Sequence, residues 1–138
     1  MSKVFKHQMN YPIFFDTKNS LILFSLRENF KFISQLYFKK NLPKVLMFTG
    51  NKGSGKSTLI NHFLYSIFDK DNYNQKKFSI SENSKFLKQF QNNIFSNIIY
   101  INGADYKSVK IEDVRNLKKQ ILQSTISKNE RFIIFDDI

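Results

Sequence analysis

The sequence predicts an α/β fold in which helices flank a parallel sheet. Short apolar runs bounded by turn residues alternate with longer segments whose apolar residues recur with a helical period. A glycine-rich loop separates the first apolar run from the helical segment after it. The resulting order is strand, loop, helix, strand, helix, strand, which is typical of parallel strands joined by crossover helices.

The first half of the chain supplies an arm, a helix and a strand. Residues 1–19 mix lysines and aromatics around Pro12 without a steady period, which predicts an extended N-terminal arm. Apolar residues at steps of three and four predict an amphipathic helix over residues 20–39. Residues 44–49 form a short apolar run between a proline and a glycine, which predicts a strand buried on both faces.

The second half continues the alternation. Two adjacent apolar stripes predict a helix over residues 56–68. Residues 69–97 are rich in polar residues and predict an insertion with one helix around 84–92. A second strand is expected at 98–101, and a helix from Ile111 carries acidic residues in its first turn and lysines later, as the helix dipole favours. The apolar run before Asp136 and Asp137 predicts the last strand, over 131–137.

Composition narrows the class of protein. The chain has 138 residues, a formal charge of +11 and 41% hydrophobic residues, which indicates one folded domain or part of one. It has no cysteine, so disulfides, Cys-ligated zinc and Cys nucleophiles are excluded. No apolar stretch reaches the roughly 18 residues of a membrane span, and the start is too polar for a signal peptide. We expect a cytoplasmic protein that contacts no membrane.

Residues 50–57 match the phosphate-loop pattern G-x-x-x-x-G-K-[ST]. Glycines let the backbone approach a phosphate closely, a lysine reaches the β- and γ-phosphates, and a Ser hydroxyl ligates Mg²⁺. Lys56 and Ser57 are the residues expected to do so here. The nucleotide-binding residues predicted are Gly50, Asn51, Lys52, Gly53, Ser54, Gly55, Lys56, Ser57 and Thr58. The alternative is an ordinary glycine-rich turn before a helix.

A magnesium–nucleotide site also needs a carboxylate at the end of a hydrophobic strand. Asp136 is the predicted metal ligand together with Ser57. Asp137 is expected to orient or deprotonate the attacking water, so Asp137 and Lys56 are the predicted catalytic residues. An acidic turn without a metal is the alternative for this pair.

Three segments together resemble a known family. They are residues 42–50, which lead into the phosphate loop, residues 111–117 (Ile-Glu-Asp-Val-Arg-Asn-Leu) and residues 131–137. They resemble the clamp-loader branch of the AAA+ ATPases, and within it the DNA polymerase III delta-prime type of subunit. The resemblance covers about residues 20–138 and implies a AAA+ domain of which this chain is the N-terminal part, with the sheet incomplete and further strands beyond Ile138.

The resemblance implies an ATP- or ADP-binding subunit, with Mg²⁺, that helps to load a sliding clamp on primed DNA. Its implied partners are the other clamp-loader subunits, the clamp, and primer-template DNA held through its phosphate backbone. Two departures stand out: residues 69–97 lack the four-cysteine zinc module of many members, so no zinc is expected, and Asp137 stands where hydrolysing members have Glu. Weak ATP turnover is therefore the expectation.

Two other functions stay open: a different P-loop enzyme such as a kinase, and a non-hydrolysing subunit that holds its neighbours in an assembly. Several other residues are candidates for contacts with partners, and for each the alternative is an ordinary solvated or packed side chain. Three lysine pairs (39–40, 76–77 and 118–119) and Arg115 are candidates for DNA or subunit contacts, and the Tyr11–Pro12 pair is a candidate for contact with adenine. His7 and His62 are too isolated to form a metal or catalytic set.

Overall fold

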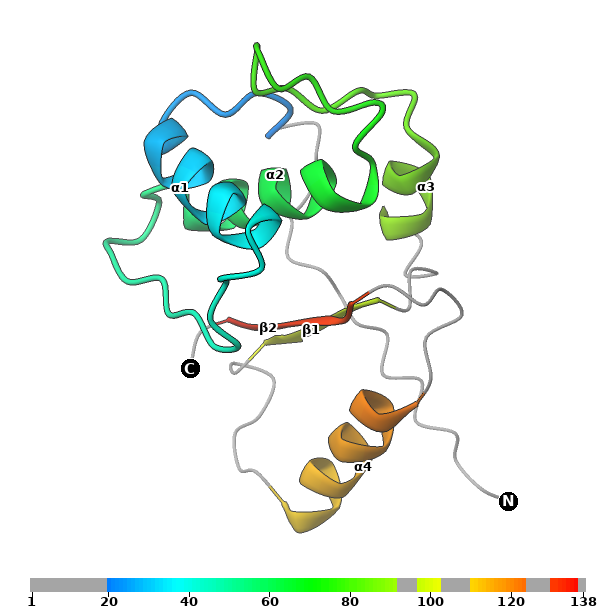
Figure 1. The fold of residues 1–138 in the computed structure, drawn as a ribbon. Helices are drawn as coiled ribbons and strands as arrows, with labels where there is room; N and C mark the ends of the chain where they lie inside the picture. Colours follow the sequence, from blue (N-terminus) through cyan, green and yellow to red (C-terminus); the bar gives the residue numbers. More distant parts are fainter. Residues whose placement is uncertain (1–19, 92–96, 103–109, 124–129, 137–138) are drawn as a thin grey trace. The chain divides into compact units, whose positions relative to one another are not determined.

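The structure is a computed structural model that describes residues 20–91, 97–102, 110–123 and 130–136 (Figure 1). The chain divides into two compact units, Pro12–Gln91 and Met1–Tyr11 with Asn92–Ile138. The described part of the first unit holds α1 (Arg27–Phe38), α2 (Lys56–Phe68) and α3 (Lys85–Gln91). The described part of the second unit holds β1 (Ile98–Asn102), α4 (Ile111–Leu122) and β2 (Phe132–Asp136). The predicted arm, residues 1–19, lies outside the described residues.

Helix α2 forms the centre of the helical unit, because most of its side chains are buried. Leu59, Phe63, Leu64 and Tyr65 are all at most 5% exposed. Phe63 meets Tyr37 of α1 edge-on at 5.8 Å, and Tyr65 meets Phe86 of α3 edge-on at 4.7 Å. Such aromatic pairs add to the stabilisation that burial alone supplies. The helix predicted at residues 56–68 is confirmed, as is a helix within 84–92.

Helix α1 begins later than the sequence predicted. Residues 20–39 carry helical periodicity, yet α1 starts only at Arg27. The preceding segment is extended instead and pairs with residues 78–80: Leu23 N–H donates to the Phe78 carbonyl, and Ile80 N–H donates to the Leu21 carbonyl, both at 2.9 Å. The start predicted at residue 20 was therefore wrong, because a tertiary pairing satisfies this backbone better than another helical turn would.

The second unit contains a parallel pair of strands (Figure 1). β1 and β2 run in register from the pair Ile98 and Phe132 to the pair Asn102 and Asp136. Hydrogen bonds also join the residues just before the two strands. Phe132 N–H donates to the Asn97 carbonyl at 2.8 Å, and the side-chain amide of Asn97 donates to the Glu130 carbonyl at 3.1 Å. The predicted α/β class and its parallel strands are thus confirmed for the described residues.

Helix α4 lies between the two strands in sequence and is closed at both ends by side chains. Lys110 N–H donates to the Asp113 carboxylate at 2.9 Å, which fixes the first turn. At the other end, Nη1 of Arg131 donates to the carbonyls of Gln120 and Ile121 at 2.7 and 2.6 Å. The helix predicted from Ile111 is confirmed. None of the described helices combines the length and apolar character needed to cross a membrane.

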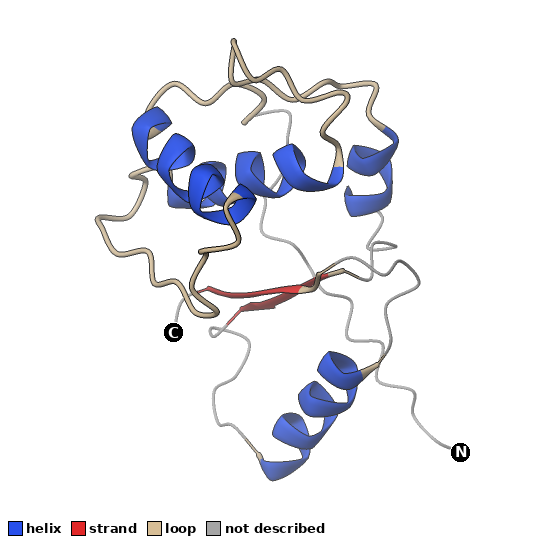
Figure 2. Ribbon diagram, in the orientation of Figure 1, coloured by secondary structure: helices blue, strands red, loops and turns tan. Residues whose placement is uncertain are grey.

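The strand predicted at residues 44–49 is not formed. No described strand pairs with this segment, and Figure 2 shows loop throughout the connection between α1 and α2. Val45 and Met47 are each 85% exposed, so the prediction of a segment buried on both faces was wrong for this structure. The physical reason is that an apolar run becomes a stable strand only when a neighbouring strand takes up its backbone hydrogen bonds.

Candidate functional site

The loop before α2 has the backbone shape that its glycines permit. Gly53 and Gly55 have φ of +81° and +87°, in the left-handed region that other residues avoid. Gly55 immediately precedes α2, and its carbonyl accepts the first helical hydrogen bond, from Leu59 N–H at 2.9 Å. Ser54 N–H closes a tight turn on the Asn51 carbonyl at 3.2 Å. The glycine spacing of residues 50–57 therefore corresponds to a tight loop that ends at a helix N-terminus.

Lys56 folds back over this loop. Its Nζ donates to the carbonyl oxygens of Gly50 at 2.9 Å and Asn51 at 2.8 Å, and to the hydroxyl of Ser54 at 3.2 Å. The single ammonium group thus joins both ends of the loop. A positive charge held among backbone groups at the start of a helix is placed to bind an anion that approaches the loop.

The first turn of α2 is open to such a ligand. No side chain caps this end of the helix, and no acidic residue occupies the first turn. Its backbone N–H groups therefore lack the usual side-chain acceptor. Ser57 and Thr58 are half-buried beside it, and the Thr58 hydroxyl lies 3.4 Å from that of Ser20, within hydrogen-bond distance.

The segment before α1 forms one wall of this region, which the sequence did not predict. A Cβ added at Gly55 would lie 3.5 Å from the hydroxyl oxygen of Ser25 and 3.6 Å from a methyl carbon of Leu26. Leu26 itself has a left-handed φ of +59°, which is unusual for a leucine. Residues of the chain far before the motif thus pack against the glycine that starts α2.

His62 of α2 forms a buried hydrogen bond with Ser20 in the segment before α1. It is fully buried; its Nε2 donates to the Ser20 carbonyl at 2.8 Å, so Nδ1 accepts from the Tyr73 hydroxyl at 2.9 Å. Burial lowers the pKa of His62 from 6.5 to about 4, and the hydrogen bond to Ser20 works in the opposite direction. The neutral ring is therefore the form present at neutral pH, and it acts as a structural link within the helical unit.

The acidic strand end lies in the second unit. Asp136 is the last residue of β2, at the carboxyl edge where ligands of parallel sheets bind. Its Oδ2 accepts a hydrogen bond from the Tyr100 hydroxyl at 2.5 Å. The one ion pair within the described residues joins Lys31 and Glu28, so Asp136 has no cationic side-chain partner there. Asp137 lies outside the described residues.

The predicted site residues therefore fall into two groups, each with its own geometry. The structure brings the loop residues and Lys56 together within the helical unit, and it joins Asp136 to Tyr100 within the other unit. Tyr100 was missed by sequence reasoning, although its position two residues before the end of a strand placed it on the same face as the strand terminus. No described cluster of three or more His, Cys, Asp or Glu residues could hold a metal ion by itself.

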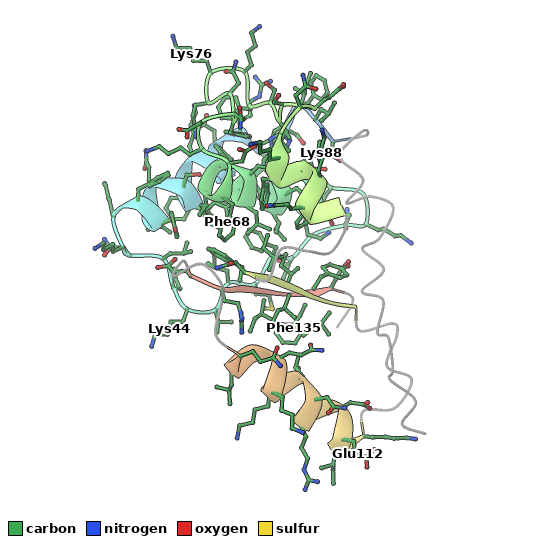
Figure 3. The ribbon with its side chains drawn as sticks, turned by 90° about the vertical axis from the view of Figure 1, so that its right-hand side faces the viewer. Lys44, Phe68, Lys76, Lys88, Glu112 and Phe135 are labelled. Carbon is green, nitrogen blue, oxygen red and sulfur yellow. The ribbon has the colours of Figure 1, made fainter. Side chains whose placement is uncertain are left out.

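The basic residues singled out for contacts are on the surface. The lysine pairs 39–40, 76–77 and 118–119 are exposed, as is Arg115. Figure 3 shows the side chains of Lys44 and Lys76 extending away from the ribbon. His7 and the Tyr11–Pro12 pair lie outside the described residues.

Comparison with known protein families decides the classification. The model of the family described as "DNA polymerase III, delta subunit" matches residues 26–138. The chain belongs to this family. Membership confirms the resemblance to the clamp-loader type of AAA+ protein, and the match includes the glycine loop, the helix start at Ile111 and the acidic strand. Neither a curated protein nor a solved structure matches the chain.

Proposed function

We propose that this member of the DNA polymerase III delta family binds ATP or ADP with Mg²⁺ and acts in a clamp loader. The observation that carries the proposal is the loop before α2, where Lys56 donates to the two carbonyls and one hydroxyl of its own loop. An ammonium group held in this way needs only to exchange these acceptors for phosphate oxygens. The uncapped start of α2 offers backbone donors to the same phosphate.

Within each unit, the chemistry of the predicted residues supports the proposal of a magnesium–nucleotide complex. Glycine at positions 53 and 55 keeps side chains away from the anion and allows the loop its left-handed turns. Ser57 would offer its hydroxyl to Mg²⁺, and Asp136, without a cationic partner among the described residues, would balance the metal's charge. When bound, Mg²⁺ would neutralise charge on the phosphates. Lys56, the loop N–H groups and Thr58 would orient the nucleotide.

The proposed partners are the other clamp-loader subunits, the sliding clamp and primer-template DNA. The exposed lysine pairs support a contact with DNA phosphates that carries no base sequence preference. Arg115, exposed on α4, is proposed to face DNA or a neighbouring subunit. The contacts with DNA would weaken with salt, since they depend on the charge of the phosphate backbone.

We expect nucleotide to control conformation and assembly more than to be consumed, because Asp137 is one methylene shorter than the Glu of hydrolysing members. A specific residue thus also favours the second candidate, a subunit that does not hydrolyse ATP. The test is ATP turnover by the protein alone and then with partner subunits, clamp and primed DNA. Turnover that rises with clamp and DNA supports a working clamp-loader ATPase. Binding without turnover in either case supports the second candidate, and phosphoryl transfer to a small molecule would contradict both.

A further inference from the structure

The Tyr100 hydroxyl donates a hydrogen bond to the carboxylate of Asp136, the last residue of β2. In the parallel pair, Tyr100 stands opposite Ile134 and Asn102 stands opposite Asp136. The tyrosine hydroxyl therefore reaches along the sheet by one diagonal step to the carboxylate at the strand end. The bond joins its hydroxyl to one named oxygen, Oδ2, at 2.5 Å. This distance is at the short end of the range for O–H···O⁻ hydrogen bonds to carboxylates.

We propose that Tyr100 is a positioning residue that fixes the Asp136 carboxylate for a divalent cation. This inference rests on the proposed magnesium–nucleotide function. The Tyr100 hydroxyl donates to Oδ2, and among the described residues no donor reaches Oδ1, so this second oxygen is the one proposed for the cation or for a water bound to it. A carboxylate that is held in one orientation needs less ordering when the metal arrives, so the metal binds more tightly.

Two observations favour this over a purely structural bond. Asp136 has no Lys or Arg partner among the described residues, so its charge is not balanced by an ion pair there. Tyr100 is only 4% exposed, so its hydroxyl is held in place by a packed ring and not by a mobile surface side chain. A rigid donor beside an unpaired carboxylate is the arrangement found around metal ligands, where the outer partner sets the orientation of the ligand.

The test measures Mn²⁺ as a spectroscopic substitute for Mg²⁺. Electron paramagnetic resonance gives the affinity of the protein for Mn²⁺ in the presence of ADP, while calorimetry with EDTA gives the affinity for ADP alone. Tyr100→Phe should weaken Mn²⁺ binding about tenfold. The metal-free affinity for ADP should stay unchanged. Asp136→Asn should remove the metal-dependent part completely. Tyr73→Phe is the matched control, because it removes another buried tyrosine hydroxyl and should leave Mn²⁺ binding as in wild type.

Equal Mn²⁺ affinity in wild type and Tyr100→Phe would overturn the inference and leave nucleotide binding intact. Absence of ADP binding by wild type would overturn the proposed function and this inference with it. A second measurement uses the wild-type protein alone. The NMR signal of the Tyr100 hydroxyl proton should remain visible and change its chemical shift when Mg²⁺ and ADP are added. Its disappearance on metal addition would mean that Tyr100 releases the carboxylate, which would also overturn the inference.

Discussion

His62 and Tyr73 share a 2.9 Å hydrogen bond inside the helical unit, and the other ring nitrogen of His62 donates to the Ser20 carbonyl at 2.8 Å. One buried ring therefore connects α2 with the segment before α1 and with the loop after α2. The proton of the neutral ring lies on Nε2, since the Ser20 carbonyl can only accept, and protonation at Nδ1 would remove the acceptor to which the Tyr73 hydroxyl donates. The connection should therefore weaken when the ring is protonated.

The first prediction is a loss of stability in acid. The folded-state pKa of His62 is lowered from 6.5 to about 4, so the unfolded state binds the proton more readily. The stability gained by keeping His62 neutral is fully present above pH 6.5. It falls as the pH drops and is lost below about pH 4. The upper limit of this contribution to the free energy of unfolding is roughly 3.5 kcal/mol, from the difference between 6.5 and about 4 at about 1.4 kcal/mol per pKa unit. Urea unfolding of wild type and His62→Gln at a series of pH values measures it; identical pH dependence of the two proteins would contradict the prediction.

The second prediction concerns the glycines of the loop. Gly53→Ala and Gly55→Ala should each destabilise the protein by about 1–2 kcal/mol, because both positions have a left-handed φ. No atom lies within 4 Å of a Cβ at Gly53, and those near Gly55 are at ordinary contact distance, so strain and not collision is the cause. Urea unfolding with Asn51→Ala as the control measures the cost. A much larger loss at Gly55 alone would show that packing against Ser25 and Leu26 dominates.

The third prediction is that Arg131 holds the end of α4. Arg131→Ala should cost about 1–3 kcal/mol, since one charged donor group serves the carbonyls of Gln120 and Ile121. Arg115→Ala, on the exposed surface of α4, should change stability by less than about 0.5 kcal/mol. Amide hydrogen exchange in the last turn of α4 should speed up only in the first variant. Equal exchange in both variants would show that the cap does not stabilise the helix.

The fourth prediction is slow ATP hydrolysis in the assembled complex. A shift of about 1 Å in a group that positions the attacking water can cost on the order of a hundredfold in rate. Asp137→Glu should therefore raise the single-turnover rate, whereas Asp137→Asn should lower it further. If Asn is as fast as wild type and Glu gives no gain, Asp137 does not position the water.

Local signals in the sequence predicted much of the fold. The helix at 56–68 and the parallel strands at 98–101 and 131–137 were found nearly at their predicted bounds, because periodicity and apolar runs report local structure directly. Two predictions were wrong, the strand at residues 44–49 and the helix start at residue 20. In both places the backbone conformation depends on pairing with a segment far away in the chain. The pattern of residues 50–57 could be recognised in the sequence because its spacing is local, and its role in phosphate binding stays a prediction.

The partners of the site residues could not be predicted in the same way. The contact of Tyr100 with Asp136 joins residues 36 positions apart, and that of His62 with Ser20 joins residues 42 apart. Both depend on which elements pack together. Sequence periodicity shows which face of an element a residue occupies, but it does not show which residue of another element will meet it there.

The central claim is that the loop before α2 binds a nucleotide through Lys56, and isothermal calorimetry of ADP with Mg²⁺ tests it most directly. Wild type should bind, and Lys56→Ala should lose binding, because the variant lacks the ammonium group that now donates to Gly50, Asn51 and Ser54. Lys44→Ala, which removes an exposed lysine outside the motif, is the matched control and should retain most of the affinity. No binding by wild type, or equal binding by Lys56→Ala, would contradict the account.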